Sequence, residues 1–232
     1  MALEVRKLAS GYGTKVVISN VSFVLQPGEI MAFLGHNGAG KSTTLKTILG
    51  LLKPVAGEIV LDGDRIDQLP VAERLNRGLR LLPEGRGIFP DLTVQENLNL
   101  LAETNCIGGD AKISLADVLR LLPALASCRA ATAASMSGGQ QQMLALALAI
   151  MGSPRCILLE EPSVGLQPDL VEHLFGHIHR ICKQYAISAV LVEHRVASAM
   201  KIADHVLIMN SGEVVFDGSP AKARESNFWE FF

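Results

Sequence analysis

Residues 35–43 read Gly35-His36-Asn37-Gly38-Ala39-Gly40-Lys41-Ser42-Thr43. The pattern G-x-x-x-x-G-K-[S/T] within this stretch is typical of a loop that binds phosphate groups. Its glycines let backbone N–H groups converge on phosphate oxygens without a Cβ in the way. Lys41 can reach the outer phosphates, and the Ser42 hydroxyl can bind Mg²⁺. The stretch therefore predicts a nucleotide-binding site formed by residues 35–43.

The residues on either side predict the structure that such a loop needs. Ile30 to Leu34 is a continuous apolar run, as expected of a buried parallel strand, and it leads directly into Gly35. A helix is predicted from Ser42 to Leu52, ending near Pro54. The N-terminus of this helix would add partial positive charge beside the phosphates. A chance Gly-rich turn would need neither flank, so we interpret the stretch as a strand–loop–helix phosphate site.

The rest of the chain shows three kinds of pattern. Strand candidates in the first part are Leu3–Leu8, Val21–Leu25 and Glu58–Leu61, with Gly11 and Gly13 among the breaks. Helical periodicity dominates from Leu92 to Met151. Later elements are the apolar strands Cys156–Leu159 and Ala189–Val192, with a helix at Leu170–Tyr185 between them. This βαβ order predicts an α/β fold with a parallel sheet and an inserted helical lobe.

Composition narrows the class of protein. The chain has 232 residues, of which 49% are hydrophobic, and a formal net charge of −2. A chain of this length and composition can bury a core, and it lacks the excess of Lys and Arg that is typical of a nucleic-acid-binding protein. The longest apolar run, Met143 to Met151, is too short for a bilayer span, which takes about 20 residues, and no leader opens the chain. We therefore expect a soluble protein that reaches a membrane only through partners.

The four cysteines, at positions 106, 128, 156 and 182, are widely spaced. No C-x-x-C pair or clustered histidine accompanies them, so they predict neither a metal site nor a disulfide framework. We expect small, mostly buried residues in a reducing cytosol.

Three downstream motifs resemble those of the ABC ATPase family. The run Ser137-Gly138-Gly139-Gln140 resembles the family's Leu-Ser-Gly-Gly-Gln signature, with Met136 in the usual Leu place. Cys156 to Glu161 looks like the Walker B strand, which ends in two carboxylates. Ser163 to Asp169 resembles the D-loop, which crosses between two ATPase subunits. A Ser-Gly-Gly turn alone is a common helix start, but its place behind a phosphate loop makes the resemblance specific.

The resemblance implies a role for each candidate residue. Glu160 would help hold Mg²⁺ and Glu161 would be the general base that polarises the attacking water. His194 matches the switch histidine that contacts the γ-phosphate, and Tyr12 matches the aromatic that stacks on adenine. The family usually has Asp-Glu here, so the longer Glu160 predicts ATPase activity with a weaker Mg²⁺ dependence.

The resemblance covers nearly the whole chain and implies a single ABC ATPase domain over residues 1–232. The implied fold is a P-loop NTPase with a RecA-like parallel sheet core, an antiparallel β subdomain and an inserted α-helical lobe. The expected sublobes are 1–30 and 56–66 (antiparallel β), 31–55 and 152–232 (core) and 88–151 (helical lobe with the signature). Expected later features are strands at Val206–Met209 and Val214–Asp217 and an aromatic end, Phe228–Phe232, packed on its own domain.

A finer resemblance starts at Pro83-Glu84-Gly85-Arg86. Most ABC ATPases carry Gln where Glu84 stands, in a loop that senses Mg²⁺ and the transmembrane partner. The present version, followed by Phe-Pro-x-Leu-Thr-Val-x-Glu-Asn-Leu, looks like the LivF-type subunits of branched-chain amino acid importers. Importers of urea or short amides share much of the pattern, so the resemblance leaves these substrates open.

The resemblance also implies cofactors and partners. ATP and Mg²⁺ would lie between the 35–43 loop of one subunit and the 137–140 signature of a second, which is either a copy or a LivG-like sister. Transmembrane permease subunits would contact the groove near Glu84, and an extracytoplasmic substrate-binding protein would act indirectly. The chain would therefore work at the cytoplasmic face of the inner or plasma membrane.

Two readings from other classes compete with transport. ABC ATPases of translation or DNA repair act on nucleic acid, but they usually have two cassettes or long coiled coils, and this chain has one cassette and no heptad run. A regulatory protein that binds ATP without hydrolysis would lack a base, yet Glu161 and His194 are both present. We therefore expect an ATPase that powers import and has no nucleic-acid partner.

Overall fold

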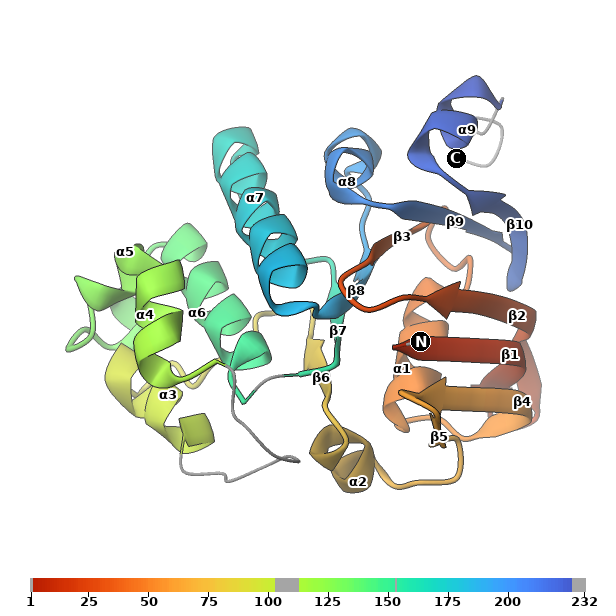
Figure 1. The fold of residues 1–232 in the computed structure, drawn as a ribbon, viewed down its shortest axis with the longest axis horizontal. Helices are drawn as coiled ribbons and strands as arrows, with labels where there is room; N and C mark the ends of the chain where they lie inside the picture. The colour runs from red at the N-terminus through yellow and green to blue at the C-terminus, as the bar shows by residue number, and fades with distance from the viewer. Residues whose placement is uncertain (1, 103–112, 153, 227–232) are drawn as a thin grey trace.

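The computed structural model describes residues 2–102, 113–152 and 154–226, whose strands form two sheets (Figure 1). The antiparallel sheet has the order β2-β1-β4-β5 and consists of β1 (Leu3–Tyr12), β2 (Lys15–Leu25), β4 (Pro54–Leu61) and β5 (Asp64–Arg65). The second sheet has the order β10-β9-β3-β8-β7-β6 and consists of β3 (Ile30–Leu34), β6 (Leu79–Leu82), β7 (Cys156–Glu160), β8 (Ser188–Val192), β9 (His205–Asn210) and β10 (Glu213–Gly218). All its pairings are parallel except that of β9 with β10.

The helices divide between the two sheets and a separate lobe. Their bounds are α1 (Lys41–Leu49), α2 (Val71–Asn76), α3 (Val94–Ala102), α4 (Leu115–Leu121), α5 (Pro123–Ala126), α6 (Gly138–Ile150), α7 (Pro168–Tyr185), α8 (Val196–Ile202) and α9 (Pro220–Glu225). Figure 1 shows α3 to α6 gathered in one lobe, with the antiparallel sheet and α1 at the opposite end of the molecule. The predicted α/β class, with an antiparallel sheet and a helical lobe, is confirmed.

Two apolar clusters hold these layers together. One joins the inner face of the antiparallel sheet to α1 and one face of the parallel sheet. The other joins the opposite face of the parallel sheet to α7 and the helical lobe. Because β3, β7 and β8 are covered on both faces, every residue in them is buried. A site that solvent can reach must therefore form in the loops that follow these strands.

No helix in the described ranges is long and apolar enough to cross a membrane.

Several predicted boundaries were wrong. β2 and β4 begin at Lys15 and Pro54, earlier than the predicted Val21 and Glu58, and two further differences involve glycines. The helix expected to run from Ser42 to Leu52 ends at Leu49, because Gly50 adopts a φ of +93° and caps it. Gly11 does not break β1, which continues to Tyr12 with shifts in register around the glycine. A Cβ on Gly11 would lie 1.9 Å from the carbonyl oxygen of Lys15, so the glycine allows a close approach of two strands.

The cysteine prediction is confirmed at two of the four positions. Cys156 and Cys182 are fully buried, and burial raises the pKa of the Cys182 thiol to about 12. Cys128 is only partly buried. Cys106 and the aromatic end at Phe228–Phe232 lie outside the described residues.

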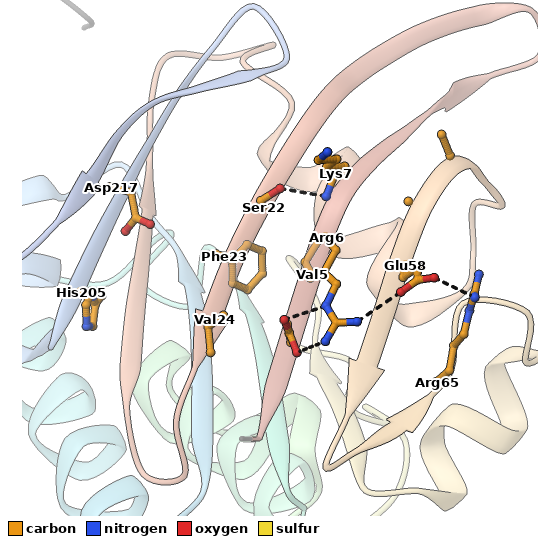
Figure 2. Close-up of a pocket in the computed structure, with 13 residues that line it drawn as sticks. Val5, Arg6, Lys7, Ser22, Phe23, Val24, Glu58, Arg65, His205 and Asp217 are labelled. Atoms are coloured by element: carbon orange, nitrogen blue, oxygen red, sulfur yellow. Dashed lines mark hydrogen bonds and ion pairs between the residues drawn. The ribbon is translucent and has the colours of Figure 1, made fainter.

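The outer face of the antiparallel sheet carries a row of ion pairs (Figure 2). Arg6 donates to Glu4 at 2.7 Å and to Glu58 at 3.3 Å, and Arg65 donates to Glu58 at 2.8 Å. A hollow of about 1080 Å³ lies over this face, and none of the predicted nucleotide-site residues lines it. Exposed pairs of this kind contribute little stability. The predicted phosphate loop and the predicted general base lie elsewhere, at the ends of the parallel strands.

Candidate nucleotide site

The register of the parallel sheet brings four predicted segments to one edge. Phe33 of β3 pairs with Val192 of β8, and Val192 pairs with Glu160 of β7. On the other side of β7, Leu159 pairs with Leu82 of β6. The loops that follow these strands begin with Gly35, Glu161, Glu193 and Pro83, so they all leave from the same carboxyl edge. Ligands of open α/β sheets bind at this edge.

The phosphate loop is held between β2 and β9, and only glycine fits at its two ends. Gly35 has a φ of +141°, and a Cβ there would lie 2.3 Å from the carbonyl oxygen of Met209. Gly40 has a φ of +106°, and a Cβ there would lie 2.7 Å from Cγ2 of Ile18. Both positions combine left-handed backbone with contact that no side chain tolerates. The loop is therefore fixed in place before α1 starts at Lys41.

Lys41 lies inside this loop with only 5% of its surface exposed. Its Nζ donates to the carbonyl oxygens of Gly35 at 2.7 Å and His36 at 3.0 Å. Burial lowers the pKa of Lys41, and the nearby carboxylate of Glu161 raises it in part. The loop's own carbonyl oxygens therefore hold the Lys41 ammonium in place.

His36 adds a second basic group at the loop. Its Nδ1 lies 2.7 Å from the carbonyl oxygen of Asn37, and its Nε2 lies 2.9 Å from Oδ1 of Asn210. Both partners are acceptors, so both ring nitrogens donate only when the imidazole is protonated. The hydrogen bond to Asn210 above all, and then that to Asn37, raises the pKa of His36.

Glu161 and His194 meet at the adjacent ends of β7 and β8. His194 Nε2 lies 2.7 Å from Glu161 Oε1, and the Glu161 N–H donates to the carbonyl oxygen of Val192 at 2.9 Å. Glu161 has a φ of +48°, a left-handed conformation that is rare for a residue with a side chain. Such strain is concentrated at functional positions. The structure thus brings Glu161 and His194 into contact, at the same sheet edge from which the phosphate loop leaves.

Three oxygen-bearing side chains were predicted as Mg²⁺ ligands. Ser42 lies in the first turn of α1, Glu84 is exposed just beyond β6, and Glu160 ends β7 with 8% of its surface exposed. The Glu160 carboxylate has no hydrogen-bond partner among the described residues, which leaves its lone pairs available. The described ranges hold no cluster of three or more His, Cys, Asp or Glu side chains that could bind a metal. One or two carboxylates with a hydroxyl and substrate phosphates are the usual environment of Mg²⁺, so the residues fit that ion.

The signature residues lie apart from this cluster. Ser137 caps α6 in a capping box, in which the Gln140 N–H donates to Ser137 Oγ at 3.3 Å and the Ser137 N–H donates to Gln140 Oε1 at 3.0 Å. Figure 1 shows α6 in the helical lobe, well separated from α1. Tyr12, at the end of β1, is half exposed. The chain therefore does not bring Ser137-Gly138-Gly139-Gln140 to its own phosphate loop.

Comparison with known proteins agrees with this geometry. The family model described as "ABC transporter" matches residues 18–164, more than half of the chain. The chain belongs to the ABC transporter family. As a member of this family it is an ATP-binding and ATP-hydrolysing ABC ATPase.

Several relatives match this ABC ATPase over nearly its full length. The branched-chain amino acid transport ATP-binding protein BraG of Pseudomonas aeruginosa is 34% identical, covering 94% of this chain and 93% of the relative. A probable branched-chain amino acid transport protein, LivF of Archaeoglobus fulgidus, is 33% identical, covering 98% and 96%. The lipopolysaccharide export protein LptB of Haemophilus influenzae is 31% identical, covering 94% and 90%. A solved ATP-binding subunit of an ABC transporter is 30% identical, with a TM-score of 0.80 over 97% of this chain and 92% of that one.

Sequence reasoning missed three contacts of this ABC ATPase. Arg86, with a φ of +77°, donates through Nη1 to Gln141 Oε1, joining the loop of Glu84 to the signature helix. Glu193 and Arg195, on either side of His194, bond to the turn that follows Glu161. One signal was available, because an acidic residue directly after the apolar strand Ser188–Val192 needs several donors if it is buried.

Proposed function

We propose that this ABC ATPase powers a membrane importer of branched-chain amino acids. The observation that carries the proposal is the end-to-end match, at 33–34% identity, to two proteins named for branched-chain amino acid transport. The Pro83-Glu84-Gly85-Arg86 loop, which resembles that of LivF-type subunits, supports the same conclusion. The chain would act at the cytoplasmic face of the membrane, bound to permease subunits.

The chemistry at the strand ends supports specific roles. Glu161 is the general base that orients the attacking water, because it follows β7 at the same sheet edge as the phosphate loop and its carboxylate accepts from His194. His194 holds that carboxylate and contacts the γ-phosphate. Residues 35–43 bind the phosphates through backbone N–H groups and the Lys41 ammonium, and Tyr12 stacks on the adenine.

Mg²⁺ would be held by Ser42 and Glu160, with Glu84 beside them at the next strand end. When bound, the ion neutralises charge on the outer phosphate oxygens. Glu160 reaches the ion with one more methylene than the family's usual Asp. We therefore expect the Mg²⁺ dependence to differ from that of an Asp variant.

Two ATPase subunits would pair head to tail, as a homodimer or with a LivG-like sister. Each ATP would then lie between residues 35–43 of one subunit and Ser137-Gly138-Gly139-Gln140 of the other. The separation of α6 from α1 within one chain supports this arrangement (Figure 1). Closure of the pair on ATP, followed by hydrolysis and opening, would drive the transport cycle.

A groove beside the Glu84 loop supports contact with the permease. It has a volume of about 470 Å³ and lies between α2, β6, α3 and α6. Leu100 and Phe89 line it and are largely exposed, 42% and 55% respectively. Arg86 also lines it and bonds to Gln141 of the signature helix. A permease segment seated here would therefore touch residues linked to the signature.

The carboxylate assignment is tested by Glu161→Gln. The variant keeps the size of the side chain but cannot accept a proton, so it should bind ATP with wild-type affinity and hydrolyse it at least about 100-fold more slowly. Closed dimers should accumulate in the presence of ATP. Turnover close to that of the wild type would show that another group is the base.

The substrate is tested on the assembled transporter. The chain is co-purified with its permease and companion binding protein, and ATPase activity is measured with leucine, isoleucine, valine, short amides and urea. Stimulation by the branched-chain amino acids alone supports the proposal. Stimulation by urea or amides would assign the related importers instead.

One observation favours a second function. LptB, a lipopolysaccharide export protein, matches this chain at 31% identity over 94% of its length. An exporter would have no extracytoplasmic binding protein among its companions. Co-purification with lipopolysaccharide-export membrane subunits, without such a binding protein, would therefore replace import by export.

A further inference from the structure

The turn that follows Glu161 has buried ends and an open tip. It is closed by two backbone hydrogen bonds, from the Val164 N–H to the Glu161 carbonyl and from the Leu166 N–H to the Ser163 carbonyl, both 3.1 Å. Ser163 and Leu166 are buried, whereas Val164 is 50% exposed. Gly165, beside it, is also exposed, with a φ of +75°. The tip at 164–165 is thus presented outward on a firmly held base.

A buried carboxylate holds the first end of this turn. Glu193 is only 1% exposed, yet no Lys, Arg or His side chain within the described residues pairs with its charge. It accepts from the Ser163 N–H and the Ser163 hydroxyl, each at 2.9 Å, and from the His194 N–H at 3.1 Å. Leaving a buried carboxylate without donors is strongly unfavourable. Ser163 and the backbone of His194 are therefore held to the same two oxygen atoms.

Arg195 holds the other end. Its Nη2 donates to the carbonyl oxygen of Leu166 at 2.8 Å. The two neighbours of His194 therefore form hydrogen bonds to the two ends of the turn, Glu193 to Ser163 and Arg195 to Leu166. The histidine between them bonds through Nε2 to Glu161, the residue from which the turn starts. These contacts form a closed circuit of short hydrogen bonds.

We propose that Glu193 and Arg195 are positioning residues that make the 163–166 turn and His194 move as one unit. Pressure on the tip at 164–165, where a second subunit would touch it, then sets the contact between His194 and Glu161. This inference rests on the roles of Glu161 and His194 and on the paired subunits under "Proposed function". It adds a reason why the hydrolytic groups respond to a neighbour: the turn cannot shift without shifting the histidine.

The chain offers a mild variant and a matched control. Ser163→Ala removes one hydroxyl donor from Glu193 and leaves the shape of the turn intact. Ser198→Ala removes a hydroxyl that bonds to Glu172 at 2.9 Å on an exposed helix face, away from the site. Arg195→Ala removes the hydrogen bond to the Leu166 carbonyl, and Arg195→Lys restores a cationic donor near that carbonyl.

The experiment measures kcat, KM for ATP and thermal unfolding for the full chain purified with its permease. Because misplacing a reacting group by about 1 Å can cost a factor of about 100 in rate, we expect Ser163→Ala and Arg195→Ala to lower kcat about 10-fold or more. Their KM should stay within about twofold and their unfolding temperature should match that of Ser198→Ala. Arg195→Lys should recover part of the rate. This split between kcat and stability separates positioning from a merely structural role.

Three results would overturn the inference, and they are distinguishable. If Glu161→Gln abolishes turnover while Ser163→Ala and Arg195→Ala behave like Ser198→Ala, the positioning role of Glu193 and Arg195 is refuted and the proposed base stands. If Glu161→Gln keeps its turnover, the assigned base is refuted, and the inference that Glu193 and Arg195 position the hydrolytic groups is refuted with it. If Ser163→Ala and Arg195→Ala lower the unfolding temperature but leave kcat unchanged, Glu193 and Arg195 stabilise the turn without positioning the hydrolytic groups.

Discussion

Arg74 is the residue whose replacement we expect to destabilise the phosphate-loop half of the molecule most. It lies on α2 with 2% of its surface exposed, and within the described part of the chain its guanidinium donates only to carbonyl oxygens of the main chain. The acceptors are Leu69 at 2.9 Å, Thr47 and Ile48 at 2.8 Å and Asp67 at 2.7 Å. Thr47 and Ile48 belong to the last turn of α1, where the carbonyls lack the i+4 partner of a helix interior and carry partial negative charge, although the Gly50 N–H also donates to the Thr47 carbonyl at 3.1 Å.

The expected magnitude for Arg74→Met follows from these bonds. Each hydrogen bond of a charged donor contributes about 1.5–3 kcal/mol net, but burying the guanidinium itself costs several kcal/mol. Methionine fills most of the volume and removes the side-chain donor from all four carbonyls, of which Thr47 still accepts from the Gly50 N–H. Removing one member of a buried charged assembly typically costs about 3–5 kcal/mol. We expect the free energy of unfolding to fall by that amount.

The assay is urea unfolding followed by circular dichroism, with Arg77→Met as the matched control. Arg77 is the C-cap of the same helix, and the one ion pair it makes among the described residues is an exposed one with Asp64, so its loss should cost less than about 1 kcal/mol. A destabilisation by Arg74→Met as small as that of the control would refute the reasoning. It would mean that the carbonyls of α1 are equally well satisfied by water.

Three further predictions are independent of Arg74. Glu160→Asp should shift the Mg²⁺ concentration for half-maximal ATPase rate by a few-fold, since the shorter carboxylate changes the reach to the ion; superimposable titration curves would contradict this. Asn210→Ala should lower the pKa of His36 in an NMR titration, because it removes the main acceptor that raises it. The stability from protonated His36 is fully present below the unfolded-state pKa and lost as pH rises through the raised folded-state pKa. In the folded chain, iodoacetamide should modify Cys128 much faster than Cys182, whose thiol burial keeps protonated; equal rates would indicate that the core opens readily.

Much of the fold was predictable because its signals are local. The apolar run Ile30–Leu34 before Gly35 predicted β3 and its loop, and the alternation after Cys156 predicted β7, α7 and β8. These patterns depend only on residues near one another in the chain. The confirmed α/β class therefore needed no knowledge of tertiary contacts.

Contacts between distant segments explain what was missed. Arg74 packs so closely on the end of α1 that its Nε would lie 2.9 Å from a Cβ at Gly50, and no sequence pattern near Gly50 indicates that contact. The grip of Glu193 on Ser163 spans 30 positions of sequence. Gly11 was interpreted as a break, since its role in a close strand approach depends on Lys15 across the hairpin. Sequence patterns locate such residues without revealing their partners.

The distribution of anion-binding groups in this chain gives a physical ground for pairing of subunits. The capping box of α6 uses the Ser137 hydroxyl on the Gln140 N–H, so the N–H groups of Gly138 and Gly139 remain without helical partners. Such a helix start attracts phosphate, yet it stands in the helical lobe, apart from the loop that begins α1 (Figure 1). A phosphate held by residues 35–43 would meet the helix start of α6 only if that helix belonged to a second subunit. In the head-to-tail pair proposed above, the helix start of α6 would bind a phosphate held by the other subunit, and a twofold axis would give each copy the same arrangement.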